Sequence, residues 1–143
     1  MERNVPRVMG TFIMRRIIAS EAFWDLTGTA IKVYMIFCLK CKIETISAGN
    51  RDIKYILNNG KIIFTFIEAE KKYGIQNSTF NRALDLLIKV GLIEVIDRGG
   101  VHHTSKYAIS NNWRLYPEQT FERTKSSNLV GKKTRFKKRP PRS

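Results

Sequence analysis

The sequence predicts a mainly α fold with a small antiparallel β-sheet, followed by a basic disordered C-terminal tail. Residues 65–91 contain two consecutive amphipathic helical patterns with a glycine between them. Residues 92–110 contain two apolar segments that are separated by a Gly-Gly turn. Residues 118–143 are rich in Lys, Arg, Ser and Pro, and have too few aliphatic side chains to offset the entropy lost on ordering.

The length and the charge of the chain limit its organisation and its partners. A chain of 143 residues can build one hydrophobic core but not two. It has 26 Lys and Arg residues against 12 Asp and Glu residues, and the resulting charge of +14 attracts polyanions whatever the fold. We expect an N-terminal segment (1–19), one globular domain (20–117) and a flexible basic tail (118–143).

The N-terminal segment carries no targeting signal that the sequence reveals. Charged residues interrupt it before any apolar run long enough for a signal peptide. The longest apolar run, residues 33–39, is far shorter than the ~20 residues that a membrane span needs. We therefore expect a cytoplasmic protein without a membrane contact. Residues 11–14 are expected to add a short edge strand.

Residues 26–42 predict the first long helix, capped by Thr27 or Thr29. Its main apolar stripe consists of Leu26, Ala30, Tyr34, Phe37, Cys38 and Cys41. Further apolar side chains extend almost all round the helix, namely Ile31, Val33, Met35, Ile36 and Leu39. This helix must therefore be covered on more than one side, either as the centre of the fold or as the interface of a homodimer.

Two cysteines, Cys38 and Cys41, lie three residues apart on this predicted helix. Zinc requires four ligands, and a redox-active Cys-x-x-Cys pair normally opens a helix rather than standing within one. His102 and His103 are the only remote candidates for further ligands. We therefore interpret both cysteines as core residues, and expect neither a metal nor another cofactor.

Residues 50–64 allow two interpretations. The apolar segments on either side of Asn59-Gly60 predict a hairpin with a two-residue type I′ turn, whose second arm, residues 62–64, joins the small sheet. Alternatively, residues 50–58 form a helix that ends at Gly60. Periodicity alone does not decide between the hairpin and the helix.

Residues 65–90 predict a helix-turn-helix. Thr65 and Glu68 have the spacing of a capping box, and Gly74 supplies the positive φ that ends the first helix. The second helix, residues 77–90, has an inward-facing stripe of Phe80, Ala83, Leu84, Leu87 and Ile88. Its outer side carries groups suited to base edges and phosphates: Asn77, Ser78, Asn81, Arg82, Asp85 and Lys89. Alternatively, this side is only a solvated surface on which Asp85 pairs with Arg82 and Lys89.

The segments after this helix add further candidate contacts. At or near the tip of the predicted two-stranded sheet stand Arg98, His102, His103 and Lys106. Trp113, Leu115 and Tyr116 are expected to fold back on the core, and Pro117 to mark the end of the fold. A phosphate clamp that is independent of base sequence is expected from the tail residues Lys132, Lys133, Arg135, Lys137, Lys138 and Arg139.

Three segments of the chain together resemble the winged helix-turn-helix family. They are NNGKIIFTF before the first helix of the pair, RALDLLIKVGLIEV through the second, and YAISNNWRLY after the Gly-Gly turn. Within the family they are similar to the DNA-binding domains of phage- and plasmid-borne replication or regulatory proteins. The resemblance covers roughly residues 20–116 and implies that residues 77–90 are a recognition helix and residues 92–110 a wing. The sequence departs from the family at Glu70, where a small residue is usual, which bears on the angle between the two helices.

The sequence contains no catalytic constellation, and an enzyme is not expected. No Ser or Cys nucleophile has an evident base, no glycine-rich phosphate loop follows a strand, and no carboxylate pair is set for acid-base chemistry. We expect a protein that binds double-stranded DNA in replication initiation or in transcriptional regulation, since the fold does not separate these roles. The alternatives are a basic protein that binds RNA or the ribosome, and a protein-interaction module that uses residues 26–42.

Overall fold

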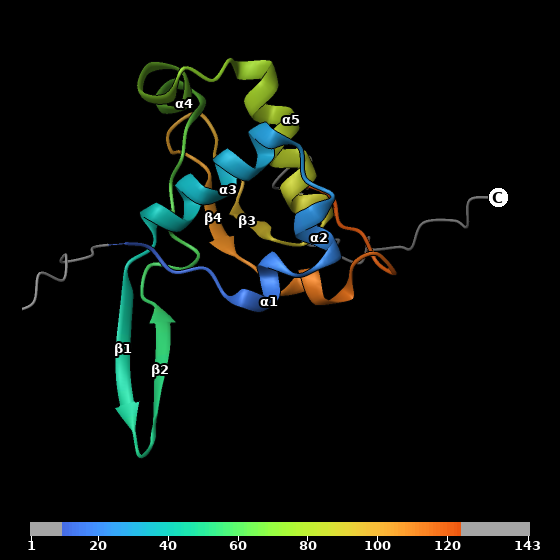
Figure 1. The fold of residues 1–143 in the computed structure, drawn as a ribbon. Helices are drawn as coiled ribbons and strands as arrows, with labels where there is room; N and C mark the ends of the chain where they lie inside the picture. The colour runs from blue at the N-terminus through green and yellow to red at the C-terminus, as the bar shows by residue number, and fades with distance from the viewer. Residues whose placement is uncertain (1–9, 124–143) are drawn as a thin grey trace, which may run out of the picture.

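The structure is a computed structural model that describes residues 10–123, which form a mixed α/β fold (Figure 1). These residues contain five α-helices, one 3-10 helix and two separate two-stranded antiparallel sheets. The elements in chain order are α1 (Arg15–Ile18), α2 (Glu21–Trp24), α3 (Gly28–Lys40), β1 (Ile43–Ala48), β2 (Arg51–Ile56), α4 (Phe66–Tyr73), α5 (Asn77–Lys89), β3 (Ile93–Asp97), β4 (Lys106–Ile109) and η1 (Asn112–Leu115). The sequence predicted one small sheet, so the second sheet is the main difference in fold class.

The core lies where α3 packs against α5 and the β3–β4 sheet. The Phe37 ring of α3 meets the rings of Phe64 and Tyr107 edge-on, with centroids 5.4 and 5.3 Å away. Phe64 in turn meets Phe80 of α5 at 4.8 Å. All four rings are buried, so a single aromatic cluster joins three elements and the segment that leads into α4.

Helix α3 is central to the fold, which is one of the two alternatives that its apolar pattern allowed. The Thr27 hydroxyl caps it by accepting a hydrogen bond from the backbone N–H of Ala30 at 3.2 Å. The predicted stripe is buried except for Cys41, which is half-buried, and Val33 and Ile36 are buried as well. Only Met35 and Leu39 of its large apolar side chains are exposed, at 47% and 62%. The prediction of a dimer through residues 26–42 depended on the apolar surface of this helix. Packing within the chain covers most of that surface.

Both cysteines are free thiols, and their environment is that of core residues. Burial raises the pKa of Cys38 to about 12, and burial also raises the pKa of Cys41. The Cys41 thiol donates a hydrogen bond to the carbonyl oxygen of Phe37 at 3.4 Å. Within residues 10–123, no three His, Cys, Asp or Glu side chains are grouped so that they could hold a metal ion.

The two helices predicted over residues 65–90 are present as α4 and α5. Thr65 caps α4 by accepting a hydrogen bond from the N–H of Glu68 at 3.1 Å, and Gly74 ends it with a φ of 70°. Only half of the capping box forms, because the Glu68 carboxylate binds the Lys40 ammonium at 2.7 and 2.8 Å instead of the backbone of Thr65. In α5, all five residues of the predicted inward stripe are buried.

Residues 11–14 do not form the predicted edge strand. They are irregular and lead into α1, whose Ile17 side chain is buried. The Thr11 hydroxyl donates a hydrogen bond to the carbonyl oxygen of Cys38 at 2.9 Å, near the end of α3. The segment therefore packs against the end of α3 and, through Phe12, against Lys54 of β2, without pairing with either strand of the hairpin.

Both interpretations of residues 50–64 were wrong. The hairpin forms between β1 and β2, so it reverses before Arg51 and not at Asn59-Gly60. Gly49, with a φ of 66°, is the turn residue. The Asn59 side chain is used instead to bond the backbone of Ile109, accepting from its N–H at 2.7 Å and donating to its carbonyl oxygen at 3.1 Å. Of residues 62–64, only Ile62 joins the second sheet, through one antiparallel bridge to Tyr107.

The C-terminal part of the fold extends beyond its predicted end at Pro117. Trp113 is buried and Tyr116 packs on the core, whereas Leu115 is 47% exposed and does not act as an anchor. Phe121 also packs on the core, and its N–H donates to the carbonyl oxygen of Lys89 at 3.2 Å. The folded part therefore includes at least residues 118–123 of the predicted tail. The rest of that tail, including the six predicted clamp residues, lies outside the described residues.

We predict that Gly91 is essential for joining α5 to the sheet. It has a φ of 87°, and a Cβ added there would lie 2.5 Å from the carbonyl carbon of Asn112, which is backbone and cannot move aside. The matched control is Gly74, whose φ of 70° is similar but whose surroundings are open. Gly74→Ala should lower the free energy of unfolding by about 1 kcal/mol, and Gly91→Ala by more than about 3 kcal/mol, measured by denaturant titration. Equal losses would show that the contact with Asn112 is easily relieved.

Candidate nucleic-acid interface

The outer side of α5 carries the six polar residues that the sequence assigned to it, and all six are exposed. They lie opposite the buried stripe, so the helix is divided lengthwise into an apolar half and a hydrogen-bonding half. With 13 residues, α5 is about 20 Å long, and its outer half is a continuous row of donors and acceptors.

The N-terminal half of this row is ordered by an asparagine pair. The Asn81 side-chain amide donates to the side-chain oxygen of Asn77 at 2.9 Å and to the Asn77 carbonyl oxygen at 3.2 Å. These bonds fix the direction of the Asn81 amide along the helix and leave its oxygen exposed as an acceptor. Ser78 and Arg82 stand beside this pair, one residue further along the helix in each case.

The alternative interpretation, in which Asp85 pairs with Arg82 and Lys89, is wrong. The carboxylate oxygen of Asp85 instead accepts hydrogen bonds from Arg123, at 2.9 Å from Nε and 2.5 Å from Nη2. Arg123 also donates to the carbonyl oxygen of Asn81 at 3.2 Å. In the part of the chain that the structure describes, neither Arg82 nor Lys89 forms an ion pair. Sequence reasoning missed Arg123 because 38 residues separate it from Asp85.

The segment that carries Arg123 runs along α5. Phe121 bonds to Lys89 at the end of the helix, and Arg123 bonds to Asn81, two turns nearer its start. The last described residues therefore lie against the polar side of α5. The described part of the chain thus ends at the side that carries the candidate contacts.

The β3–β4 loop is held in shape by bonds around Asp97. Its carboxylate accepts a hydrogen bond from the N–H of Gly99 at 3.0 Å and lies 3.2 Å from Nε2 of His103. Gly100 and His103 form a further backbone bridge, and the Ser105 hydroxyl donates to the carbonyl oxygen of Arg98. His103 therefore turns back towards Asp97 although its side chain remains 51% exposed, and His102 is exposed as well. Arg98 and Lys106 are half-buried at the base of the loop.

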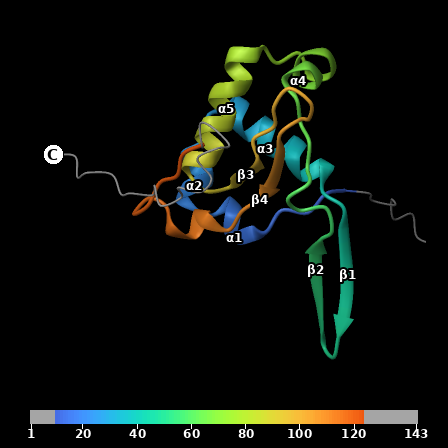
Figure 2. The ribbon, with the colours of Figure 1, turned by 180° about the vertical axis from the view of Figure 1, so that it is seen from behind.

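This loop lies at the same end of the molecule as α4 and the start of α5 (Figure 1). The β1–β2 hairpin projects from the opposite end (Figures 1 and 2). The start of α5 and the β3–β4 loop thus lie at one end of the fold, whereas Asp85 and Lys89 lie further along α5.

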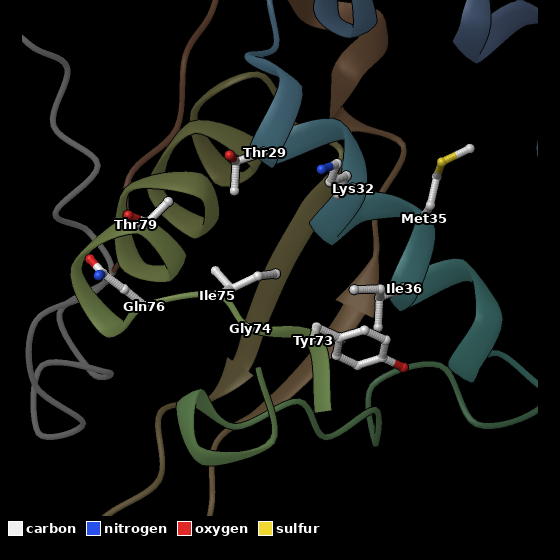
Figure 3. A pocket seen from close by; sticks show the side chains of 9 residues that line it. All are labelled: Thr29, Lys32, Met35, Ile36, Tyr73, Gly74, Ile75, Gln76 and Thr79. Carbon is white, nitrogen blue, oxygen red and sulfur yellow. The ribbon is translucent and has the colours of Figure 1, made fainter. Parts of the chain in front are cut away.

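A hollow of about 550 Å³ lies between α3 and the turn that joins α4 to α5 (Figure 3). Ile75 of the turn lines this hollow, is half-buried and packs against the core. Four polar side chains also line the hollow: Thr29, Lys32, Gln76 and Thr79. Lys71 and Lys72, in the last turn of α4, add exposed positive charge nearby. The sequence analysis missed these lysines, although two adjacent lysines before the turn glycine were a readable signal.

Comparison of the chain with protein-family models, with curated proteins and with solved structures finds no match. Within residues 10–123, no helix combines the length and the apolar character that crossing a membrane requires. The functional interpretation therefore depends on the geometry and the charges described above.

We predict that the carboxyl pKa of Asp97 lies below its ordinary value of 3.8. The hydrogen bond from the N–H of Gly99 lowers this pKa most, and His103 and Lys106 add to the effect. Because the folded-state pKa is the lower one, the carboxylate stabilises the loop above the unfolded-state pKa of about 3.9, and this stabilisation is lost as the pH falls through the folded-state pKa. Carboxyl NMR signals followed from pH 7 to pH 2 measure the midpoint.

Two variants separate the causes of this shift. In His103→Ala, the pKa of Asp97 should rise only in part, since the bond from Gly99 is larger and remains. In Asp97→Asn, the amide signals of Gly99 and His103 should lose their common acid transition. A midpoint at or above 3.8 in the unmodified chain would contradict the loop geometry.

Proposed function

We propose that this chain is a winged helix-turn-helix protein that binds double-stranded DNA, with α5 as the recognition helix and β3–β4 as the wing. The observation that carries the proposal is the division of α5 into a fully buried apolar stripe and an exposed row of hydrogen-bonding side chains. A helix of about 10–12 Å diameter fits the major groove of B-DNA, which is about 12 Å wide. Inserted there, this row meets base edges along its centre and phosphates at its sides.

The charges around α5 support this proposal. An unpaired carboxylate on a groove-facing helix would repel the phosphates, but Arg123 neutralises Asp85 with two hydrogen bonds. Arg82 and Lys89 then contribute uncompensated positive charge on the same side. Lys71 and Lys72 extend this charge to the end of α4, where the adjacent DNA strand would pass.

The wing and the tail are proposed to hold the backbone on either side of the groove. Exposed His102 at the loop tip, with Arg98 and Lys106 at its base, suits contacts to phosphates and sugars. In the tail, the proposed clamp consists of Lys132, Lys133, Arg135, Lys137, Lys138 and Arg139. We propose replication initiation or transcriptional regulation as the process, and no cofactor is required by this mode of binding.

The recognition helix is tested by a change at Asn81. A preferred duplex is first selected from a random pool, and the binding free energies of this duplex and of a scrambled one are then compared. Asn81→Ala should lower the discrimination between bases by about 1 to 3 kcal/mol at one or two positions of the preferred duplex. The free energy of unfolding should change by less than about 0.5 kcal/mol, because Asn81 is exposed and its side chain bonds only within α5.

Asn111→Ala is the matched control, because Asn111 is exposed, caps η1 without a side-chain hydrogen bond and lies outside α5. It should leave the discrimination unchanged. If the unmodified chain binds selected and scrambled duplexes equally, α5 does not read the groove. If structured RNA competes better than any duplex, the chain is an RNA-binding protein instead.

The tail should contribute salt-dependent affinity without base preference. Truncation after Arg123 keeps the contact with Asp85 and removes the residues beyond it. If about 4 to 6 phosphates are lost, the slope of log affinity against log salt should flatten by roughly 0.9 for each, because fewer counterions are released. Replacing the six clamp residues by Gln in the full chain controls for the loss of length. An unchanged slope, or a lost preference for the selected duplex, would contradict this role.

A further inference from the structure

The β1–β2 hairpin is an arm that the proposed DNA contacts do not use. It projects from the end of the molecule opposite α4 (Figures 1 and 2). In residues 10–123 its strands pair only with each other, in register from Ile43 opposite Ile56 to Ala48 opposite Arg51. An isolated two-stranded hairpin is at best marginally stable in water, so an arm of this kind gains stability from a partner.

The two faces of the arm differ, because directly paired residues share a face and successive residues alternate between faces. One face has Ile43 and Ile56 at the base of the arm and polar side chains towards its tip, and these polar side chains bond to each other. The Ser47 hydroxyl donates to Asp52 at 2.9 Å, and the Lys54 ammonium donates to Thr45 at 3.1 Å. Lys54 also lies over the ring of Phe12, at 5.3 Å from its centroid. This face is therefore partly covered by the N-terminal segment of its own chain.

The other face is apolar at its centre and open. Ile46 lies opposite Ile53, and Tyr55 follows on the same face towards the base of the arm. These side chains are exposed at 45%, 39% and 47%. A contiguous exposed apolar surface of this kind, on a strand pair with unpaired edges, is typical of an interaction site.

The charges on this face are complementary to themselves. Glu44 stands at the base of the arm and Arg51 at its tip, with the isoleucine pair between them. Arg51 is paired with Ala48, which lies four residues along the strand from Glu44, or about 13 Å. This distance is too long for an ion pair between Glu44 and Arg51 of the same arm. Neither has an ion-pair partner in the part of the chain that the structure describes.

We propose that this face binds the same face of a second copy of the chain, with the two arms antiparallel about a two-fold axis. The base of one arm then lies against the tip of the other, so Glu44 of each copy meets Arg51 of the other copy. The Ile46–Ile53 pairs of the two copies meet at the two-fold axis. A two-fold interface requires such a self-complementary surface, because every contact occurs twice. A single copy cannot satisfy these charges or cover these isoleucines.

Two features favour a second copy over the other possible occupants. The arm carries two acidic and two basic residues and so offers nucleic acid no net positive charge, and it points away from the end where the β3–β4 loop and the start of α5 lie. Helix α3, the dimer interface predicted from the sequence, exposes only Met35 and Leu39 among its large apolar side chains, and it contains no acidic residue that could pair with a lysine of a second copy. The proposed arm interface is independent of DNA binding, so either proposal can fail alone.

Charge reversal tests the pairing directly, with the full chain and without DNA. Light scattering at tens of micromolar should give a dimer mass for the unmodified chain. Glu44→Arg and Arg51→Glu each create two like-charge contacts and should raise the dissociation constant by roughly 100-fold or more. An equimolar mixture of the two variants should restore the dimer mass, because every contact in the mixed dimer then joins opposite charges. The double variant should also dimerise by itself.

Asp52→Arg is the matched control, since it reverses a charge on the same arm but on the polar face, and should leave the mass unchanged. Circular dichroism and thermal melting confirm that each variant is folded. A monomeric mass for the unmodified chain would overturn the proposal, as would a dimer that neither reversal weakens, or a mixture that stays monomeric. If Arg51→Glu instead weakens only the binding of duplex DNA, the arm is a nucleic-acid contact and the proposed dimer is wrong.

Discussion

The fold depends on the aromatic cluster around Phe37 and Phe64. These two rings meet at 5.4 Å, Phe37 also meets Tyr107 of β4, and Phe64 also meets Phe80 of α5. Because the segment before α4 supplies Phe64, the cluster fixes the start of α4 relative to α3, α5 and the sheet at once. The Lys40–Glu68 ion pair lies at the edge of this cluster, with the Lys40 ammonium 5.1 Å from the Phe64 centroid. Burial of four aromatic side chains thus determines which side of α5 remains outside.

The candidate site is a consequence of this packing. The inward stripe of α5 is complete over its full length, so none of its polar side chains is needed for the core. Gly91 then lets the chain reverse tightly against η1 and return as β3, which brings the β3–β4 sheet beside the helix. The exposed row on α5 and the loop around Asp97 are therefore held in place by contacts within the chain.

The sequence predicted the features that depend on neighbouring residues. The cap at Thr65, the turn at Gly74 and the stripe of α5 all lie within one or two helical turns, where spacing carries the information. The β1–β2 hairpin was missed because nearly all of its residues are exposed, so burial imposes no alternating pattern. Asn59-Gly60 was the stronger turn signal, but the Asn59 side chain bonds Ile109, 50 residues away. The contact between Asp85 and Arg123 could not be predicted from the sequence either, because no local pattern links two residues that are 38 positions apart.

That contact makes the outer side of α5 a composite of two distant segments. Asp85 alone would leave the helix with mixed charge, which weakens attraction to phosphates. Arg123 removes this obstacle, and its bond to Asn81 holds the chain against the same side of the helix. Lys132 is the ninth residue after Arg123, and a chain of nine residues spans at most about 30 Å. At 3.4 Å per step along one strand, this distance covers about nine nucleotides of the flanking backbone. The bonds of Arg123 to Asp85 and Asn81 thus keep the first residues of the proposed clamp close to the groove that α5 is proposed to enter, whereas Arg139, sixteen residues after Arg123, has a longer reach.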